Sequence, residues 1–381
     1  MATPQERFHA CMTHNNADRR PNHDLGVWAQ TAARWRAEAA EPCAGFTWNW
    51  FEGEAALDLD PRAFIPINFD FIPPFEATII EETPTYEIRR DSHGVITKAL
   101  KAGTVDGMRM SMDQHLEHPV KTPADWPDVK RRLIAAVPER YPPDLSERMA
   151  QWRNRDCPLI LGVNCAANGF YWRAREFMGT EALSLAFFLY PDMVHDMMAT
   201  FADLIIETSR PVLENITVDY FTLNEDLSMK TGPLLGPDLF RTFIFPHLKR
   251  MATFFREHGV RWFAVDTDGD PTPLIPLFMD AGVNVLWPVE RAADVSPVAW
   301  RRRFGRDLRL WGGVDKRVLA QGRRQIRDHL RELIPLIEEG GFIPTVDHVV
   351  PPDVSWDNFR YYMDCKRALL CGDFAYLEKT P

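Results

Sequence analysis

The chain has 381 residues, which is enough for one large domain or two of ordinary size. Hydrophobic residues make up 45% of it and charged residues 26%, which excludes a disordered or fibrous protein. The formal net charge of −10 and the lack of a basic segment argue against nucleic acid or an anionic membrane as the main partner.

The cysteine pattern and the lack of a long apolar segment indicate in which cellular compartment the protein is found. None of the six cysteines forms a C-x-x-C pair, which indicates a reducing environment and no thiolate zinc cage. No apolar run approaches the ~20 residues that a membrane span needs, and the first residues lack the apolar region of a signal peptide. We therefore expect a cytoplasmic protein.

The N-terminal region, residues 1–155, is irregular and rich in aromatic residues and proline. Within it, β-rich runs at 86–90 and 95–98 flank a glycine-bearing turn at 91–94, which predicts a hairpin. We expect this region to supply the first barrel strands and to cover the barrel mouth. Residues 156–381 are then the main barrel body, and the whole chain is one structural domain.

From residue 157 onward, short apolar runs alternate with long amphipathic stretches, which is typical of parallel βαβ units. With two candidate first strands, the runs total eight, and this number favours a (β/α)8 TIM barrel with an irregular N-terminal extension. An open doubly wound sheet is the alternative, but no G-x-G-x-x-G turn follows any strand. The predicted strands are 24–28, 63–67, 158–163, 218–223, 261–265, 283–287, 308–311 and 341–346, and the clearest predicted helices are 190–215, 237–258 and 323–339.

Polar residues follow six consecutive predicted strands. In a parallel barrel, all of these positions lie on the C-terminal rim, where the active sites of this fold are found. Asp and Asn also favour loop starts and helix caps, so the joint pattern is more informative than any one position. The residues are Asn164; Asn224, Glu225 and Asp226; Asp266, Asp268 and Asp270; Glu290; Asp315; and Asp347 with His348.

The alternating carboxylates after the 261–265 run suggest a cation site. An EF-hand loop is excluded, because it needs Glu at its twelfth position and Leu277 stands there. Alternate residues at a strand end face the same way, so Asp266 and Asp268 together with His348 could hold a divalent metal. The alternative is that one Asp caps the next helix and another pairs with an arginine.

Other polar and aromatic residues near the predicted strand ends have possible roles in catalysis or substrate binding. His348 is the only histidine at a predicted strand end, which favours acid/base or ligand chemistry. Serine-hydrolase chemistry is not indicated, because no G-x-S-x-G elbow exists, and Cys165 has no activating base nearby. Four aromatic residues could form a pocket wall or pack in the core, namely Trp28, Trp48, Trp50 and Phe51.

The segment from about 215 to 365 resembles the uroporphyrinogen decarboxylase-like superfamily, and the N-terminal third is compatible with it. Together the segments that carry the resemblance are fairly specific for the superfamily and much less so for a reaction. They are 224–233 (NEDLSMKTGP), 266–270 (DTDGD), 288–290 (PVE), 312–316 (GGVDK) and 340–354 (GGFIPTVDHVVPPDV).

The resemblance implies a (β/α)8 barrel and one of two activities. One branch of the superfamily decarboxylates the acetate groups of a porphyrinogen without a cofactor. That branch carries two arginines spaced by four that grip substrate carboxylates; Arg34 and Arg36 are present, but the Met-Arg-Gln-x-Gly-Arg pattern is not. This departure counts against porphyrinogen decarboxylation, since a tetra-acid substrate needs several cations.

The other branch consists of zinc-dependent methyltransferases that pass methyl groups between a corrinoid protein and a thiol, a pterin or a methyl donor. Their zinc is held by a His-x-Cys pair and a later Cys. The resemblance aligns Asp266 and Asp268 with that pair and His348 with the later cysteine. Such a site has harder ligands, so zinc is expected but manganese or iron is possible, and thiol activation is in doubt.

The sequence therefore predicts a methyltransferase, acting as a demethylase on a small methylated substrate with a corrinoid or pterin acceptor. The metal or His348 would activate the substrate heteroatom, and Asp226, Asp266 and Glu290 would position the substrate or act as a base. The alternative is a cofactor-free decarboxylase of a porphyrinogen-like or smaller aromatic acid, and a third is a non-catalytic binding barrel. A corrinoid protein and a second copy of the chain are the candidate partners. The predicted substrate-binding residues are Trp28, Asn164, Asn224, Glu225, Lys230 and Asp315.

Overall fold

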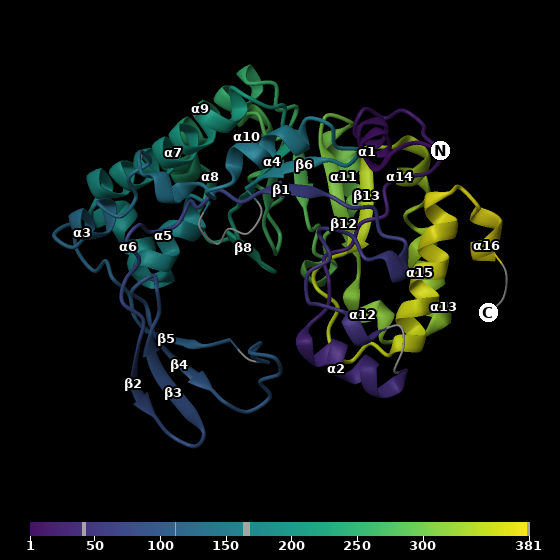
Figure 1. Cartoon of the computed structure of the whole chain (residues 1–381), viewed down its shortest axis with the longest axis horizontal. Coiled ribbons are helices and arrows are strands. Elements are labelled where there is room, and N and C mark those ends of the chain that lie inside the picture. The colour runs from purple at the N-terminus through teal and green to yellow at the C-terminus, as the bar shows by residue number, and fades with distance from the viewer. Residues whose placement is uncertain (40–42, 111, 163–167, 379–381) are drawn as a thin grey trace.

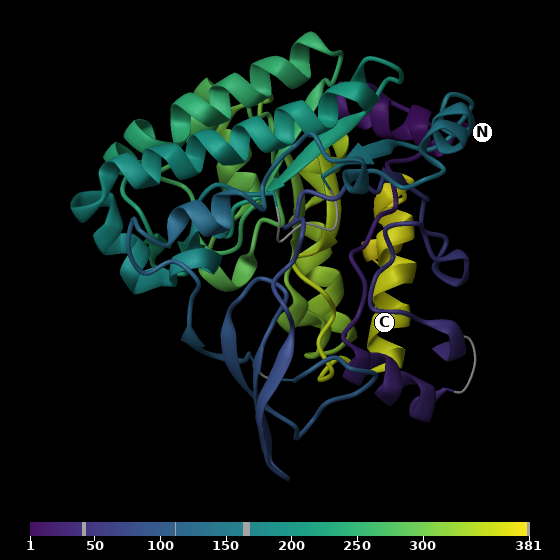
Figure 2. The same cartoon turned by 60° about the vertical axis from the view of Figure 1, so that its left-hand side comes forward.

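The computed structural model describes residues 1–39, 43–110, 112–162 and 168–378. Its centre is a curled parallel sheet of seven strands in the order β1-β6-β7-β10-β11-β12-β13 (Figures 1 and 2). Each strand corresponds to one of the predicted apolar runs. They are β1 (Ala63–Ile65), β6 (Leu159–Leu161), β7 (Tyr220–Asn224), β10 (Trp262–Asp266), β11 (Val285–Trp287), β12 (Arg309–Val314) and β13 (Phe342–Val346).

Helices follow the strands as the amphipathic stretches predict, and none in the described ranges has both the length and the apolar character to cross a membrane. The longest, α7, buries one side against the sheet and α9. The helices are α1 (Pro4–Met12), α2 (Ala29–Glu38), α3 (Trp126–Lys130), α4 (Leu145–Trp152), α5 (Tyr171–Met178), α6 (Thr180–Leu189), α7 (Pro191–Leu213), α8 (Pro237–Leu239), α9 (Phe245–Glu257), α10 (Ile275–Ala281), α11 (Pro297–Phe304), α12 (Lys316–Leu319), α13 (Arg323–Arg331), α14 (Ile334–Glu339), α15 (Trp356–Leu370) and α16 (Phe374–Glu378).

The concave side of the sheet is filled at its N-terminal end by helix α1. Phe8 is fully buried there and stacks on Tyr220 at 5.3 Å between ring centroids, with Trp311 at 6.1 Å. Burying one such ring contributes about 1.5–3 kcal/mol. The side chains on the opposite faces of the strands, such as Phe221 and Val265, belong to a larger core shared with the helices. The open part of the concave side therefore lies at the carboxyl ends of the strands.

The prediction of an eighth strand at residues 24–28 is wrong, so a full (β/α)8 barrel is not confirmed. In the described chain, this segment forms only one isolated parallel bridge, between Val27 and Val350. The cause is local: Gly26 has a φ of +135°, and a Cβ there would lie 1.8 Å from the carbonyl oxygen of Trp48. Such a residue interrupts an extended ladder. On the other side, the segment is bonded to residues 48–50, because the Trp50 amide donates to the Leu25 carbonyl at 3.1 Å and the Val27 amide donates to the Trp48 carbonyl at 3.2 Å.

A glycine inside β12 makes a similar close approach, and its substitution should be costly. Gly312 has a φ of +101°, and a Cβ there would lie 1.6 Å from the Pro288 carbonyl oxygen. We expect Gly312→Ala to lower the free energy of unfolding by about 2–5 kcal/mol, because the φ is strained and the backbone must shift. Urea unfolding measures this change. Gly45→Ala is the matched control, since nothing lies within 4 Å of its Cβ, and should change stability by no more than about 0.5 kcal/mol. Equal midpoints for the two variants would contradict the expectation.

A four-stranded antiparallel sheet extends away from the body in both views (Figures 1 and 2). Its central pair is the predicted hairpin, and the Asp91 carboxylate accepts the amides of His93 and Val95 in the turn at 2.9 Å each. At the base of this sheet, His93 contacts the Asp70 carboxylate at 2.6 Å, and Arg173 reaches the same carboxylate at 3.1 Å. The strands are β2 (Thr78–Glu82), β3 (Tyr86–Arg90), β4 (Ile96–Leu100) and β5 (Gln114–Glu117).

This His93–Asp70 pair should make stability depend on pH. The hydrogen bond to Asp70 raises the pKa of His93 above its ordinary value. A raised histidine pKa means that the stabilisation is complete below the unfolded pKa of about 6.5 and is lost as pH rises through the folded pKa. We therefore expect His93→Gln to reduce the urea midpoint more at pH 6 than at pH 9. Burial raises the pKa of the neighbouring Glu176 to about 7, so the same comparison in a Glu176→Gln background is the control. A loss that is larger at pH 9 in both backgrounds would refute the assignment.

Candidate functional site

A cavity of about 500 Å³ lies at the carboxyl ends of the strands. Asn224 ends β7 and Asp266 ends β10, while Asp226, Asp268 and His348 come directly after β7, β10 and β13. This is the edge at which parallel barrels place their active sites. The lining residues are Leu25, Trp28, Trp48, Phe51, Met108, Met112, Trp172, Asn224, Asp226, Asp266, Asp268, Trp287, Pro288, His348 and Val349.

Three carboxylates face this cavity. Asp226 pairs with Arg175 at 2.7 Å, whereas no hydrogen bond or ion pair to the Asp266 carboxylate is present among the described residues. Burial raises the pKa of Asp266 well above its ordinary range, and the neighbouring Asp268 and Asp226 carboxylates raise it further. Burial, with the charges of Glu290 and Asp226, raises the pKa of Asp268 to about 7. Raised carboxyl pKa values in a cavity are typical of functional sites.

His348 lies across from this acid cluster. Its Nε2 is 4.0 Å from the Asp268 Oδ2, and its ring lies nearly parallel to that of Trp28, at 6.4 Å between centroids and 22° between planes. Burial and the nearby Lys316 lower the pKa of His348. The imidazole is therefore neutral at physiological pH and can accept or donate a proton at the cavity wall.

Much of the remaining lining is aromatic. The structure confirms part of the predicted wall, because Trp28, Trp48 and Phe51 line the cavity. Trp50 does not: it is 1% exposed and packs in the core against Phe46. The sequence analysis missed Trp172, Trp287, Met108 and Met112. Trp287 could have been predicted, since it is the last residue of a predicted strand, whereas the other three do not directly follow any predicted strand.

Two predicted site residues stabilise backbone instead of lining the cavity. Glu225 is fully buried, and its carboxylate accepts the amides of Phe170 and Tyr171 at 3.1 and 2.8 Å, at the start of α5. Asp315 caps α12 by accepting the Arg317 amide at 2.9 Å.

Two further predicted site residues do not line the cavity, and one lies outside the residues that the structure describes. Glu290 accepts the Gly269 amide at 2.9 Å and pairs with Lys316 at 3.3 Å, so it supports the loop that carries Asp268. Lys230 forms an exposed ion pair with Asp294 at 2.9 Å. Asn164, like Cys165, lies outside the described residues.

The donor set does not form a ready metal site. Within residues 1–39, 43–110, 112–162 and 168–378, no group of three His, Cys, Asp or Glu side chains is placed to hold a metal ion. Asp268 and His348 approach only to 4.0 Å, and no cysteine lines the cavity in the described chain. The divalent ion stays a prediction, which metal analysis of the purified protein tests.

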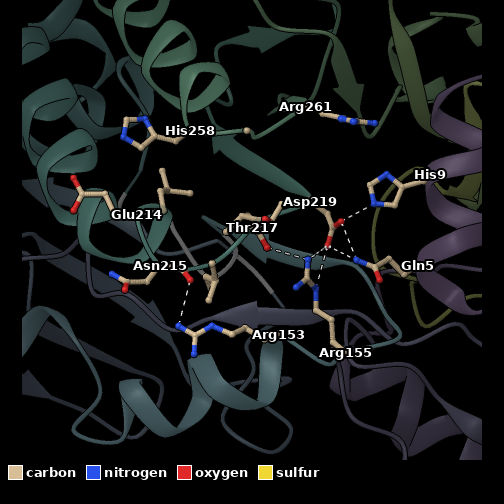
Figure 3. Close-up of a pocket in the computed structure, with 14 residues that line it drawn as sticks. Gln5, His9, Arg153, Arg155, Glu214, Asn215, Thr217, Asp219, His258 and Arg261 are labelled. Atoms are coloured by element: carbon tan, nitrogen blue, oxygen red, sulfur yellow. Dashed lines mark hydrogen bonds and ion pairs between the residues drawn. The ribbon is translucent and has the colours of Figure 1, made fainter.

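A second, larger cavity of about 830 Å³ lies at the other end of the strands, around Asp219 (Figure 3). This carboxylate is saturated: it accepts from Arg155 at 2.7 Å, from His9 at 2.6 Å and from the Leu159 amide at 2.7 Å. Gln5 also points at it. Because these groups neutralise one another at the N-terminal edge, this cavity is a stabilising network, and the carboxyl-edge cavity is the better candidate for chemistry.

The fold and the cavity define a class, namely mixed α/β proteins with a curled parallel sheet and a polar cavity at its carboxyl edge. The family model for uroporphyrinogen decarboxylase (URO-D) matches residues 174–369, which is more than half of the chain. The chain belongs to the uroporphyrinogen decarboxylase family, whose wider superfamily includes decarboxylases and methyltransferases.

Individual relatives are distant. The chain is 28% identical over 109 residues to a uroporphyrinogen decarboxylase of Hydrogenobaculum sp. (26% of this chain, 31% of the relative). It is 24% identical over 187 residues to that of Nostoc sp. (47% and 49%), so it spans about half of the length of these relatives or less. A methyltransferase from Methanosarcina mazei shares the fold at a TM-score of 0.58 and 13% identity, over 96% of this chain and 99% of that one.

Proposed function

We propose that the protein transfers a methyl group from a small methylated substrate, bound in the carboxyl-edge cavity, to a corrinoid or pterin acceptor. The observation that carries the proposal is the character of the lining: five aromatic and two methionine side chains face three carboxylates, and none of the lining residues in the described chain is Lys or Arg. Small-molecule sites combine an apolar wall with a few polar groups in this way.

The same lining argues against a polyacid substrate, because substrate carboxylates would face Asp226, Asp266 and Asp268 without a cation to balance them. The two arginines singled out in the sequence do not supply one. Arg34 pairs with Glu38 at 2.5 Å, and Arg36 reaches Asp106 at 3.4 Å. Neither lines the cavity.

In this mechanism the aromatic wall orients the methyl group and excludes water, while Asn224 and the carboxylates hold the heteroatom that carries it. Asp268 and His348, 4.0 Å apart, are the groups that can hold or return a proton at that heteroatom. Glu290 positions Asp268 through the Gly269 amide. The reduced corrinoid or pterin supplies the accepting atom, and a corrinoid protein and a second copy of the chain stay predicted partners.

A decarboxylase of a small aromatic acid is the second candidate. The curated relatives are decarboxylases, and the carboxyl groups with raised pKa could protonate the carbon from which CO₂ departs. One carboxylate of a small acid is tolerable in this cavity, whereas several are not.

The two candidates are separated by product analysis. The protein is incubated with cob(I)alamin and a panel of methylated amines, sulfides and aryl ethers, and methylcobalamin is followed by its absorbance. In parallel, uroporphyrinogen and small aromatic acids are assayed for CO₂ release. Methylcobalamin formed at a rate that depends on the protein supports the proposal, and CO₂ release without methyl transfer overturns it.

A further inference from the structure

The carboxyl-edge cavity has more acidic than basic groups. Asp266, Asp268 and Asp226 face it, and only Asp226 is paired with a guanidinium, that of Arg175. Lys316, the cation nearest to Asp268, is engaged by Glu290 at 3.3 Å. The described lining therefore presents two carboxylates without a Lys or Arg partner, together with the indole rings of four tryptophans.

We propose that the cavity accepts a methylated onium cation, a quaternary ammonium or tertiary sulfonium group, as its methyl donor. This inference rests on the proposed methyl transfer and names the substrate class for it. Onium groups are recognised by aromatic faces together with a nearby carboxylate, because the charge is spread over methyl groups that pack on the rings.

The wall already shows the pairing that such a ligand needs. The guanidinium of Arg175 lies over the Trp172 ring, 4.4 Å from its centroid, and at the same time contacts Asp226. A cation between an indole face and a carboxylate is thus stable in this part of the protein. Trp28 and Trp287 line the same cavity with Asp266 and Asp268. Trp287 is held in place, since its Nε1 donates to the Thr222 hydroxyl at 3.1 Å.

The transfer needs no proton donor and no metal held by the protein itself. The bond between the methyl carbon and nitrogen or sulfur breaks, and its electron pair stays on the heteroatom, which leaves as a neutral amine or sulfide. The new bond to the methyl carbon uses the two electrons of the acceptor, a reduced Co(I) corrinoid. The positive charge that the carboxylates attracted is lost from the substrate, so the neutral product is held less tightly and is released.

Isothermal titration calorimetry with two probes of the same shape tests the charge. Choline is an onium cation, and 3,3-dimethylbutan-1-ol has the same shape without the charge. With EDTA present and no acceptor, we expect choline to bind about tenfold or more tightly than the alcohol. Equal binding of the two probes, or binding of neither, overturns the inference.

Variants locate the binding site. Asp266→Asn removes a carboxyl group that could balance the charge of the cation and should weaken choline at least about tenfold, and Trp28→Leu should do the same by removing an aromatic face. Asp238→Asn is the control, because that side chain is fully exposed on α8 and should leave choline binding unchanged. Choline affinity that is unaltered in both cavity variants overturns the inference, as does Mn²⁺ displacing choline with a 1:1 stoichiometry, which would assign the carboxylates to a divalent metal.

These results are independent of turnover. Choline binding without any methylcobalamin formation would refute the proposed methyl transfer and leave the onium site standing. Methyl transfer from aryl ethers alone, with no choline binding, would refute the onium site and leave the methyl transfer standing.

Discussion

Replacing Asp268 by asparagine is expected to lower the rate of methyl transfer by about 100-fold or more while the fold stays intact. The substitution keeps the shape of the side chain and removes its ionisable carboxyl group. Asp268 faces the cavity on a loop held by the Glu290–Gly269 hydrogen bond, so little else should move. Initial rates of methylcobalamin formation and the thermal midpoint of the same preparations measure the two effects.

The control for this change is Asp238→Asn, whose rate should match that of the wild-type protein, since Asp238 is far out on the surface of α8. A variant at Asp268 with an unchanged rate would place the chemistry elsewhere. A fall in rate accompanied by an equal loss of folded protein would make Asp268 a structural residue.

The largest loss of stability is expected from Lys366→Met, at about 3–5 kcal/mol. Lys366 and Asp24 form a fully buried ion pair at 2.7 Å, with 0% and 1% of the side chains exposed. Burial lowers the pKa of Lys366. Asp24 also accepts the Val346 amide at 2.8 Å and the Tyr362 hydroxyl at 3.2 Å, so the pair joins the irregular segment at residues 22–28 to β13 and α15. Removing the lysine leaves the buried Asp24 charge without a balancing cation.

A double-mutant cycle measured by urea unfolding separates this charge effect from lost packing. Asp24→Asn combined with Lys366→Met should recover part of the stability lost in Lys366→Met, because no charge is left unpaired. Lys121→Met removes one half of the exposed pair with Glu117 and should have no measurable effect. A Lys366→Met variant as stable as the wild-type protein would show that the ion pair does not hold this segment in place.

The sequence was sufficient for the parallel strands because all of them except β1 are largely buried on both faces, and turn residues bound them. All seven strands of the central sheet coincide with predicted runs. The carboxyl-edge position of Asn224, Asp266 and His348 follows from the same pattern, since parallel strands end at one edge. The eighth strand failed because an apolar run does not reveal the close approach of Gly26 to Trp48.

The alternation of side chains along a strand could have predicted which of the acidic residues line the cavity and which point away from it. Asn224 and Asp226 line the cavity, whereas Glu225 between them points into the body and caps α5. Asp266 and Asp268 likewise line it on either side of Thr267. Successive side chains at a strand end face opposite ways and alternate ones share a face, so a period of two predicts these differences.

The rest of the site depends on distant segments. Trp172 comes from α5, and Met108 and Met112 come from the loop between β4 and β5. Their place at the cavity is set by tertiary packing and by the position of the antiparallel sheet, and no local pattern in the sequence encodes it. The network around Asp219 could not be predicted either, because its partners are separated from Asp219 by 60–214 residues in the sequence.

The most direct test of the account is a crystal structure of the protein soaked in trimethylselenonium, an onium cation whose selenium is located by anomalous scattering. We expect one strong selenium peak in the carboxyl-edge cavity, between the indole rings of Trp28 and Trp287 and the carboxylates of Asp266 and Asp268. A peak in the cavity around Asp219, or no peak at a concentration that saturates binding in solution, would contradict it.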